Sequence, residues 1–431
     1  MKIERPPSID LNKYFESALK EENKSFILES DQKYFYWDDV KYRKNAPFDN
    51  PVDNWGLIKA HRFMRYERIN FGYFRFCYFI TPDTAKNLHD FDLKLMGDLQ
   101  KDPMLKSEKM EFFKNSLLEE AVASSQVEGA ATTTDVARDM LKSGRAPRNE
   151  SEQMIVNNLR AINFIREFQE DDIDFKMIIE LHSIMTANTE ADNCSGNFRS
   201  SEVFVTDHVD GEIAHTPPDY RLVEKLMGEL CDFINDDTVF IHPIIKASII
   251  HFMIGFIHPF LDGNGRTARA LFYWFLLRKG YTMIGDISIS RVILESRTQY
   301  DKAFLKTEYD ENDINYFISY SIKNIRVAFE KLTKYRDKKL AERQKSYAIT
   351  YELIKKGLNQ RQADLIGYLY WKNNSNVTLN FYAEKNNIVR QTAKKDLIEL
   401  IRLNLLIENS LSKPFKYTLT GKSAVDKYLN E

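Results

Sequence analysis

Apolar residues recur at intervals of three and four through most of residues 86–330, the spacing that places them on one face of a helix. The pattern predicts helices over residues 88–99, 109–127, 151–168, 175–185, 222–234, 243–257 and 266–278. Residues 196–218 differ, because apolar positions alternate around Asp210–Gly211, and this predicts a β-hairpin. We therefore expect a mainly α fold in which a helical bundle carries one hairpin.

The two ends of the chain have other patterns. Residues 1–85 are rich in aromatic side chains, and Tyr34–Trp37 and Phe71–Ile80 are predicted as strands of a mixed N-terminal region. Residues 331–346 are strongly charged at helical spacing, which is typical of a solvated helical connector. We expect a C-terminal domain after this connector.

Residues 347–431 have the pattern of a winged helix-turn-helix domain. Val377–Ala383 and Ile388–Ile401 are predicted as its helices, and Leu405–Ile407 and Phe415–Leu419 as the strands of the wing. From Arg361 onward there are eleven Lys/Arg against seven Asp/Glu, a modest basic excess. The exposed side of the second helix is predicted to carry Arg390, Gln391, Thr392, Lys394 and Lys395. Both DNA binding and protein docking are open for such a domain.

A polar run separates the apolar helices predicted at 243–257 and 266–278. His258 ends the first helix, because the proline that follows it disfavours the helical conformation of the preceding residue. The second helix therefore begins at a tight loop, where free backbone N–H groups and the helix dipole favour an anion. The residues of this loop are Gly263, Asn264 and Gly265.

The side chains beside this loop suit nucleotide chemistry. Arg266 and Arg269 are three residues apart on the second helix, so both guanidinium groups can face one polyphosphate. Asp262 is a lone carboxylate, and Mg²⁺ is commonly held by one or two carboxylates together with substrate phosphates. His258 can act as a general base. The run predicts a site that binds a nucleoside triphosphate and deprotonates a hydroxyl beside it.

The run from His258 to Arg269 resembles the signature loop of Fic-domain proteins, His-Pro-Phe-x-Asp-Gly-Asn-Gly-Arg-x-x-Arg, at every fixed position. The resemblance implies a protein adenylyltransferase that moves AMP from ATP to a Ser, Thr or Tyr hydroxyl of a target protein or of itself. It implies His258 as the base, Asp262 as the Mg²⁺ ligand, and an ATP site formed by Gly263, Asn264, Gly265, Arg266 and Arg269. Tyr300 resembles a residue that borders the adenine in this family.

The predicted hairpin at 196–218 looks like the flap with which Fic proteins align a target polypeptide. The docking segment would be Ile213, Ala214, His215 and Thr216. The family usually has a tyrosine where His215 stands, so the detailed contacts of this flap are expected to differ.

A second motif, Ser124-Ser-Gln-Val-Glu128-Gly129, resembles the inhibitory motif of self-restrained Fic proteins whose inhibitory helix precedes the Fic core. It ends the helix predicted at about 109–129, and Gly129 is a plausible C-terminal cap. The resemblance implies that Glu128 pairs with Arg269 and takes the place of the terminal phosphate of ATP. Asn157 is expected either to hold this inhibitory helix or to serve in packing.

Composition limits the remaining classes. The chain has 431 residues, a net charge of −2 and three cysteines without a disulfide pattern, which suits a reducing cytoplasm. The sequence shows neither a signal peptide nor an apolar run long enough to cross a membrane, so no membrane partner is expected. The resemblance leaves a homodimer open.

Two functions other than AMP transfer remain open from the sequence. The same site could perform another nucleotidyl transfer or remove AMP from a protein, with Glu128 activating water. Alternatively, the chain could be a DNA-binding regulator whose Fic pocket senses a nucleotide, and a steep salt dependence of DNA binding would favour this reading.

Overall fold

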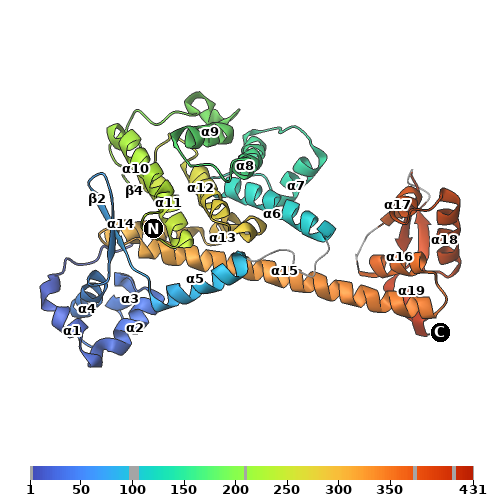
Figure 1. Cartoon of the computed structure of the whole chain (residues 1–431), viewed down its shortest axis with the longest axis horizontal. Helices are drawn as coiled ribbons and strands as arrows, with labels where there is room; N and C mark the ends of the chain where they lie inside the picture. The colour runs from blue at the N-terminus through green and yellow to red at the C-terminus, as the bar shows by residue number, and fades with distance from the viewer. Residues whose placement is uncertain (1–2, 97–105, 208–210, 372–375, 410–413, 431) are drawn as a thin grey trace. The chain divides into compact units, whose positions relative to one another are not determined.

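The computed structural model describes residues 3–96, 106–207, 211–371, 376–409 and 414–430. It divides into two compact units, Met1–Glu330 and Lys331–Glu431. Helices make up most of both units and the strands are short, so the predicted mainly α fold is confirmed (Figure 1).

The first unit begins with short helices, a hairpin and one longer helix. These elements are α1 (Phe15–Ala18), α2 (Lys24–Lys33), α3 (Trp37–Lys41), α4 (Pro51–Phe63), β1 (Glu67–Phe71), β2 (Phe74–Tyr78) and α5 (Pro82–Leu95). The bundle follows, and it consists of α6 (Lys106–Val127), α7 (Thr134–Ser143), α8 (Glu150–Glu167), α9 (Phe175–Thr186), α10 (Val223–Asn235), α11 (Pro243–Ile257), α12 (Asn264–Arg278), α13 (Ile289–Glu295) and α14 (Arg297–Tyr309). The predicted helices are therefore present, with ends shifted by a few residues. Residues 97–99 of the helix predicted at 88–99 lie outside the described residues.

The centre of the bundle is the antiparallel pair α11 and α12. Every residue of α11 except Pro243 and Gly255 is buried, which is typical of a helix enclosed on all sides. Helices α8 and α9 pack on α12, and α10 packs on α11. The loop that joins α11 to α12 is consequently held between two helices that cannot shift without disrupting the core.

The N-terminal region has its own aromatic core, and here one prediction was wrong. Tyr34–Trp37 is not a strand: Tyr34 closes α2 in a left-handed conformation with φ 46°, and Trp37 begins α3. The run is apolar because its side chains are core, with Tyr36 edge-on to Trp55 and to Tyr316. The strand predicted at 71–80 is part of the antiparallel β1–β2 hairpin, which turns at Gly72.

The predicted flap is a short hairpin between α9 and α10. Strand β3 (Val205–Thr206) pairs antiparallel with β4 (Ile213–His215), with Val205 opposite His215. Gly211 has φ 72°, as the predicted turn requires, whereas Asp210 lies outside the described residues.

Helix α15 (Asn315–Lys355) begins in the first unit and ends in the second, and it includes the charged stretch 331–346 that was predicted to be helical. The second unit contains α16 (Gln360–Trp371), β5 (Asn376–Thr378), α17 (Leu379–Lys385), α18 (Arg390–Arg402), β6 (Leu406–Asn409), β7 (Lys416–Leu419) and α19 (Lys422–Asn430). Its sheet has the order β5–β7–β6.

One boundary in this unit was misread. The helix predicted at Val377–Ala383 begins only at Leu379, because the residues before it pair as β5 with β7. Thr378 caps the helix, and its hydroxyl accepts a hydrogen bond from the N–H of Phe381 at 3.2 Å. The unit encloses its own core, which includes Tyr382, Leu397 and Leu406.

Candidate active site

His258 is the C-terminal cap of α11 and has a left-handed backbone, with φ 50° and ψ 58°. This conformation is uncommon for a residue with a side chain, and it turns the chain sharply into the loop. The ring Nδ1 lies 3.4 Å from the carbonyl oxygen of Gly255. Because a carbonyl can only accept, Nδ1 carries the proton and Nε2 keeps its lone pair. The geometry leaves His258 with a basic nitrogen available to the site.

The loop that follows is fixed by two contacts. The Asn264 side chain closes a two-way pair with the Phe260 backbone, accepting from its N–H at 2.9 Å and donating to its carbonyl at 2.8 Å. His182 from α9 stacks on Phe260 with ring centroids 3.7 Å apart. Its Nδ1 accepts from the N–H of Gly196 at 3.1 Å, so its Nε2 donates to the Asp262 carbonyl at 2.9 Å. The side chain of Asn264, a predicted ATP-binding residue, thus makes hydrogen bonds within the loop and stabilises its shape.

Helix α12 begins at Asn264, with Gly263 as its N-terminal cap in a left-handed conformation (φ 80°). The first bond of the helix runs from the Thr267 N–H to the Gly263 carbonyl, so the amides of the first turn point out of the helix end. Gly265 lies in this turn, and a Cβ there would be 2.9 Å from the Glu128 Cδ and 3.1 Å from the Arg269 Nη1. A glycine is needed at 265 for a negatively charged group to approach this closely.

Asp262 and Arg266 form an ion pair of 2.7 Å at the edge of this cradle. The carboxylate is more than half exposed, whereas Arg266 is buried and also donates to the Met185 carbonyl at 3.1 Å. The Nε of Arg266 is buried without a hydrogen-bond partner in the described part of the chain. Arg266 is therefore held in a fixed position, whereas the exposed carboxylate of Asp262 is accessible to a ligand that arrives from solvent.

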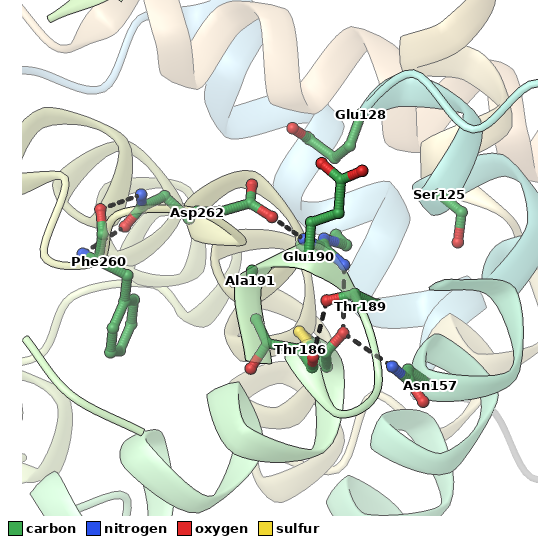
Figure 2. A network of polar contacts seen from close by, with 12 residues as sticks. Ser125, Glu128, Asn157, Thr186, Thr189, Glu190, Ala191, Phe260 and Asp262 are labelled. Atoms are coloured by element: carbon green, nitrogen blue, oxygen red, sulfur yellow. Dashed lines mark hydrogen bonds and ion pairs between the residues drawn. The ribbon is translucent and has the colours of Figure 1, made fainter. Parts of the chain in front are cut away.

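Glu128 and Arg269 join the end of α6 to the start of α12. Arg269 donates from Nη1 to Glu128 Oε1 at 2.9 Å, from Nε to the Ser124 hydroxyl at 3.0 Å, and from Nη2 to the Ser124 carbonyl at 2.8 Å. Arg269 is 2 % exposed and the Glu128 side chain 25 %. Figure 2 shows the carboxylates of Glu128 and Asp262 extending toward the same space above the loop. A carboxylate thus occupies the end of α12 where the sequence predicted a phosphate.

The end of α6 is held from several directions. Gly129 has φ 94° and donates to the Gln126 carbonyl at 3.1 Å, which confirms it as the helix cap. Asn158 donates to the Ser125 hydroxyl at 2.6 Å. Asn157, one residue earlier, faces away and donates to the Ala187 carbonyl at 2.6 Å, so of the two roles expected for it packing is the observed one (Figure 2).

The electrostatics of the site follow from burial and from the Glu128–Arg269 pair. Burial lowers the pKa of His258 to about 4, so the ring is neutral near pH 7. Burial acts to raise the pKa of Glu128, but Arg269 outweighs it and the pKa is lowered overall. Near neutral pH the site holds the neutral imidazole of His258, the Glu128 carboxylate and two guanidinium groups, with the side chain of Asp262 at its edge.

The flap is pinned beside His258 by Arg199, a residue to which the sequence assigned no role. Its guanidinium donates to the His258 carbonyl at 2.9 Å, to the Ser201 carbonyl at 3.1 Å and to the Pro218 carbonyl. Arg199 therefore joins the two ends of the flap to the loop. No carboxylate among the described residues pairs with it, and burial lowers the pKa of its guanidinium group. Neither Arg199 nor His182 stood out in the sequence, because their partners are backbone carbonyls and amides far along the chain.

The residues of the predicted docking segment differ in exposure along β4. Ile213 is 56 % exposed, Ala214 is half-buried and His215 is buried. His215 lies 2.8 Å from the Glu308 carboxylate through Nδ1 and 2.8 Å from the Phe256 carbonyl through Nε2. Thr216 follows β4 and is exposed. His215 therefore anchors the flap to α14, which leaves Ile213 as the accessible apolar residue.

Tyr300 lies in the core beside the site and not on its open side. Its hydroxyl is 2.9 Å from His251 Nε2, and only 7 % of the residue is exposed. Arg297, three residues earlier, lies over the ring of Tyr300 and donates to the Val127 carbonyl in the last turn of α6. These contacts place Tyr300 behind the Glu128–Arg269 pair.

Residues 172–276 match the family model described as Fic/DOC family. This stretch runs from α9 through the flap and the loop to α12. This stretch of the chain is therefore similar to a Fic domain. The fold agrees: the chain superposes on a Fic family protein from Desulfovibrio desulfuricans G20 with a TM-score of 0.55 and 18% identity, covering 80% of this chain and 98% of that one. Fic-1 from Caenorhabditis elegans gives a TM-score of 0.53 at 18% identity, with 77% and 90% covered.

Curated relatives of the Fic domain carry the name protein adenylyltransferase. The chain is 28% identical over 220 residues to protein adenylyltransferase Fic of Nematostella vectensis, which covers 51% of this chain and 48% of the relative. It is 32% identical over 153 residues to protein adenylyltransferase Fic of Drosophila willistoni, covering 35% and 28%. The chain spans about half or less of the length of these relatives. In the described residues, no helix is long and apolar enough to cross a membrane.

Proposed function

We propose that this chain is a protein adenylyltransferase that transfers AMP from ATP to a Ser, Thr or Tyr hydroxyl of a protein, and that Glu128 inhibits it. The observation that carries the proposal is the Glu128 carboxylate, which sits against Gly265 at the start of α12 and is held by Arg269. In this proposal the Glu128 carboxylate occupies the position that the terminal phosphate of a triphosphate would take. The names of the relatives support the choice of ATP and of a protein acceptor.

In this proposal the hydroxyl oxygen of the target attacks the α-phosphorus of ATP, and pyrophosphate leaves. His258 takes the hydroxyl proton on Nε2, because Nδ1 is held by the Gly255 carbonyl. The first-turn amides of α12 stabilise the charge that develops on the phosphates, which is commonly the largest catalytic contribution. Arg266 and Arg269 hold the leaving phosphates once Glu128 withdraws.

Asp262 is the residue that would hold Mg²⁺. In the described part of the chain, no group of three or more His, Cys, Asp or Glu side chains is arranged to bind a metal. A lone exposed carboxylate beside a phosphate cradle nevertheless suits Mg²⁺, which takes most of its other ligands from phosphates and water. When bound, the ion would neutralise phosphate charge. Asp262 would then exchange its ion pair with Arg266 for the metal.

The flap would align the target. We propose that a target segment lies along β4, where Ile213 is exposed and the strand pairs on one edge only within the described residues. The buried side chains of His215 and Arg199 hold the flap beside His258 through their contacts with the carbonyls of Phe256 and His258. This places an acceptor hydroxyl by backbone pairing, so that side chains of the target contribute less to its position.

The role of His258 is tested in the Glu128→Gly background, where inhibition is absent. A general base contributes about 10²- to 10⁴-fold, so His258→Ala is expected to lower AMP transfer from ATP at least about 100-fold. His89→Ala, at an exposed histidine on α5, is the matched control and should leave the rate unchanged. A rate for His258→Ala within tenfold of its parent would contradict the assignment.

The second unit supports a second proposal, that it is a winged helix-turn-helix domain which binds DNA. Arg390, Lys394 and Lys395 are exposed on α18, and none of the three has a carboxylate within ion-pair distance among the described residues. The test is fluorescence anisotropy with duplex DNA at several salt concentrations. Lys394→Gln/Lys395→Gln should weaken binding and flatten the salt dependence by about two counterions. Absence of binding even at low salt, about 50 mM, would contradict the proposal.

A further inference from the structure

A cavity whose lining includes no residue of the loop 258–269 lies in the first unit. It has a volume of about 370 Å³, is open to solvent on one side, and is lined by the end of α2, the start of α5, and one face each of α14 and α15. This volume is in the range of small-molecule sites, roughly 300–1,000 Å³. It is too small for a folded partner or a nucleic acid duplex.

The lining of this cavity is strongly basic. Five cationic side chains line it, Lys33, Lys302, Lys306, Lys323 and Arg326, against the two carboxylates of Asp31 and Asp83. Both carboxylates are already engaged. Asp31 pairs with Arg65 at 2.9 Å, and Asp83 accepts from the Asn87 side chain at 3.0 Å.

Two of the five cations also have partners. Lys33 pairs with Glu29 at 3.0 Å, and Lys306 is 3.9 Å from Asp39. For Lys302, Lys323 and Arg326, the described residues provide no carboxylate within 4.0 Å. Lys302 is on α14, whereas Lys323 and Arg326 are on α15, so positive charge reaches the cavity from two helices. Hydroxyl and amide groups, among them Thr84, Gln299 and Tyr320, complete the lining.

We propose that this cavity binds a small phosphate-bearing anion and that the inhibitory helix α6 senses its presence through α14. A phosphate group offers several acceptor oxygens and about two negative charges, so it can satisfy three converging cations where one carboxylate could not. The N-terminus of α5, capped by the buried Thr81, also opens into the cavity and adds positive potential.

The connection to α6 is short. On α14, Gln299 and Lys302 face the cavity, while Arg297 at the start of the same helix donates to the Val127 carbonyl of α6. Tyr320 is shared: it lines the cavity, its ring lies 5.8 Å from that of Tyr300, and its hydroxyl is 2.9 Å from the Ser296 hydroxyl. A ligand held by Lys302 therefore acts on the same helix whose Arg297 contacts the last turn of α6.

Calorimetric titration of the full chain with inorganic pyrophosphate tests the binding. The cavity variant is Lys302→Gln/Lys323→Gln/Arg326→Gln, and its matched control is Lys20→Gln/Lys44→Gln/Arg160→Gln, with the same charge change at exposed positions elsewhere. The cavity variant should lose one pyrophosphate or bind it at least tenfold more weakly, while the control stays within twofold of wild type. Equal binding by the cavity variant and wild type would overturn the proposal. So would absence of pyrophosphate binding by wild type.

Hydrogen exchange of peptides covering residues 120–129 tests the link to α6. Pyrophosphate should change the exchange of these peptides in wild type and in the control variant, but not in the cavity variant. Binding to the cavity without any change in these peptides would overturn the link. Neither measurement depends on AMP transfer, so failure of the proposed activity would leave both results interpretable.

Discussion

Glu128 and Arg269 form a 2.9 Å ion pair that joins the last turn of α6 to the first turns of α12. Arg269 also donates twice to Ser124, so a single guanidinium fixes both the carboxylate and the backbone that carries it. Because Arg269 is buried, separating the pair without a replacing anion would leave an uncompensated buried charge, which is strongly destabilising. Inhibition by Glu128 is therefore expected to be a stable state of the protein, which an effector or a target must actively displace.

A Gly265→Ala substitution tests whether the Glu128 carboxylate packs against residue 265. The added Cβ would lie 2.9 Å from the Glu128 Cδ, so we expect a loss of about 1–3 kcal/mol in the free energy of unfolding. In the Glu128→Gly background the same substitution meets no carboxylate and gains helix propensity, although its Cβ would still lie 3.1 Å from the Arg269 Nη1, so its cost should be smaller. Thermal unfolding of the four proteins in this double-mutant cycle measures the difference. Equal costs in both backgrounds would show that Glu128 does not lie against Gly265.

Glu120 provides a way to loosen α6 without touching Glu128. Its buried carboxylate accepts from the Tyr273 hydroxyl at 2.8 Å, the Ser288 hydroxyl at 2.8 Å and the Ser290 N–H at 3.1 Å. Glu120→Gln places an N–H₂ group among donors, at a cost of about 1–3 kcal/mol. We expect faster labelling of protein by α-labelled ATP than in wild type. Destabilisation of α6 without any rise in labelling would contradict the account.

Arg199 is a positioning residue for the flap. Arg199→Met would leave the carbonyls of His258, Ser201 and Pro218 without a donor, each at a cost of about 1–3 kcal/mol if it stays buried. In the Glu128→Gly background, we expect the KM for a protein target to rise more than kcat falls, since in the proposed mechanism the flap aligns the target. Arg199→Lys should recover part of the loss. An effect on kcat alone would argue against a role in target alignment.

Acid pH should destabilise the first unit through its buried histidines. The pKa of His258 is about 4 in the folded protein, against about 6.5 when exposed, so the unfolded chain binds a proton that the folded chain does not. The stabilisation is complete above about pH 6.5 and is lost as the pH falls toward 4. His258 should contribute about 1–3 kcal/mol to this loss.

Urea denaturation between pH 4.5 and 7.5 measures this dependence. His258→Ala should show a smaller fall in unfolding free energy over that range than wild type. His182, also lowered to about 4, and His251, lowered to about 3, maintain a residual fall in the variant. Identical pH dependence of the two proteins would show that His258 is not shielded from solvent.

The sequence was sufficient where short-range chemistry decides the structure. The helix–loop–helix at Pro243–Arg278 followed from apolar periodicity, one proline and two glycines. It was insufficient where the partner is a backbone group far along the chain, as for Arg199 with the His258 carbonyl and His182 with the Asp262 carbonyl. The run Tyr34–Trp37 was misread because a short apolar run fits a strand and a buried turn equally well. Asn158 rather than Asn157 faces α6, a difference of one helical position that periodicity alone does not resolve.

Labelling with ATP tests the central claim most directly. Wild type, Glu128→Gly and Glu128→Gly/His258→Ala would be incubated with Mg²⁺ and ATP labelled at the α- or the γ-phosphate. The account predicts label on protein from α-labelled ATP only, strong in Glu128→Gly and at least about 100-fold lower in the double variant. Label from γ-labelled ATP, or no label in Glu128→Gly from either nucleotide, would contradict it.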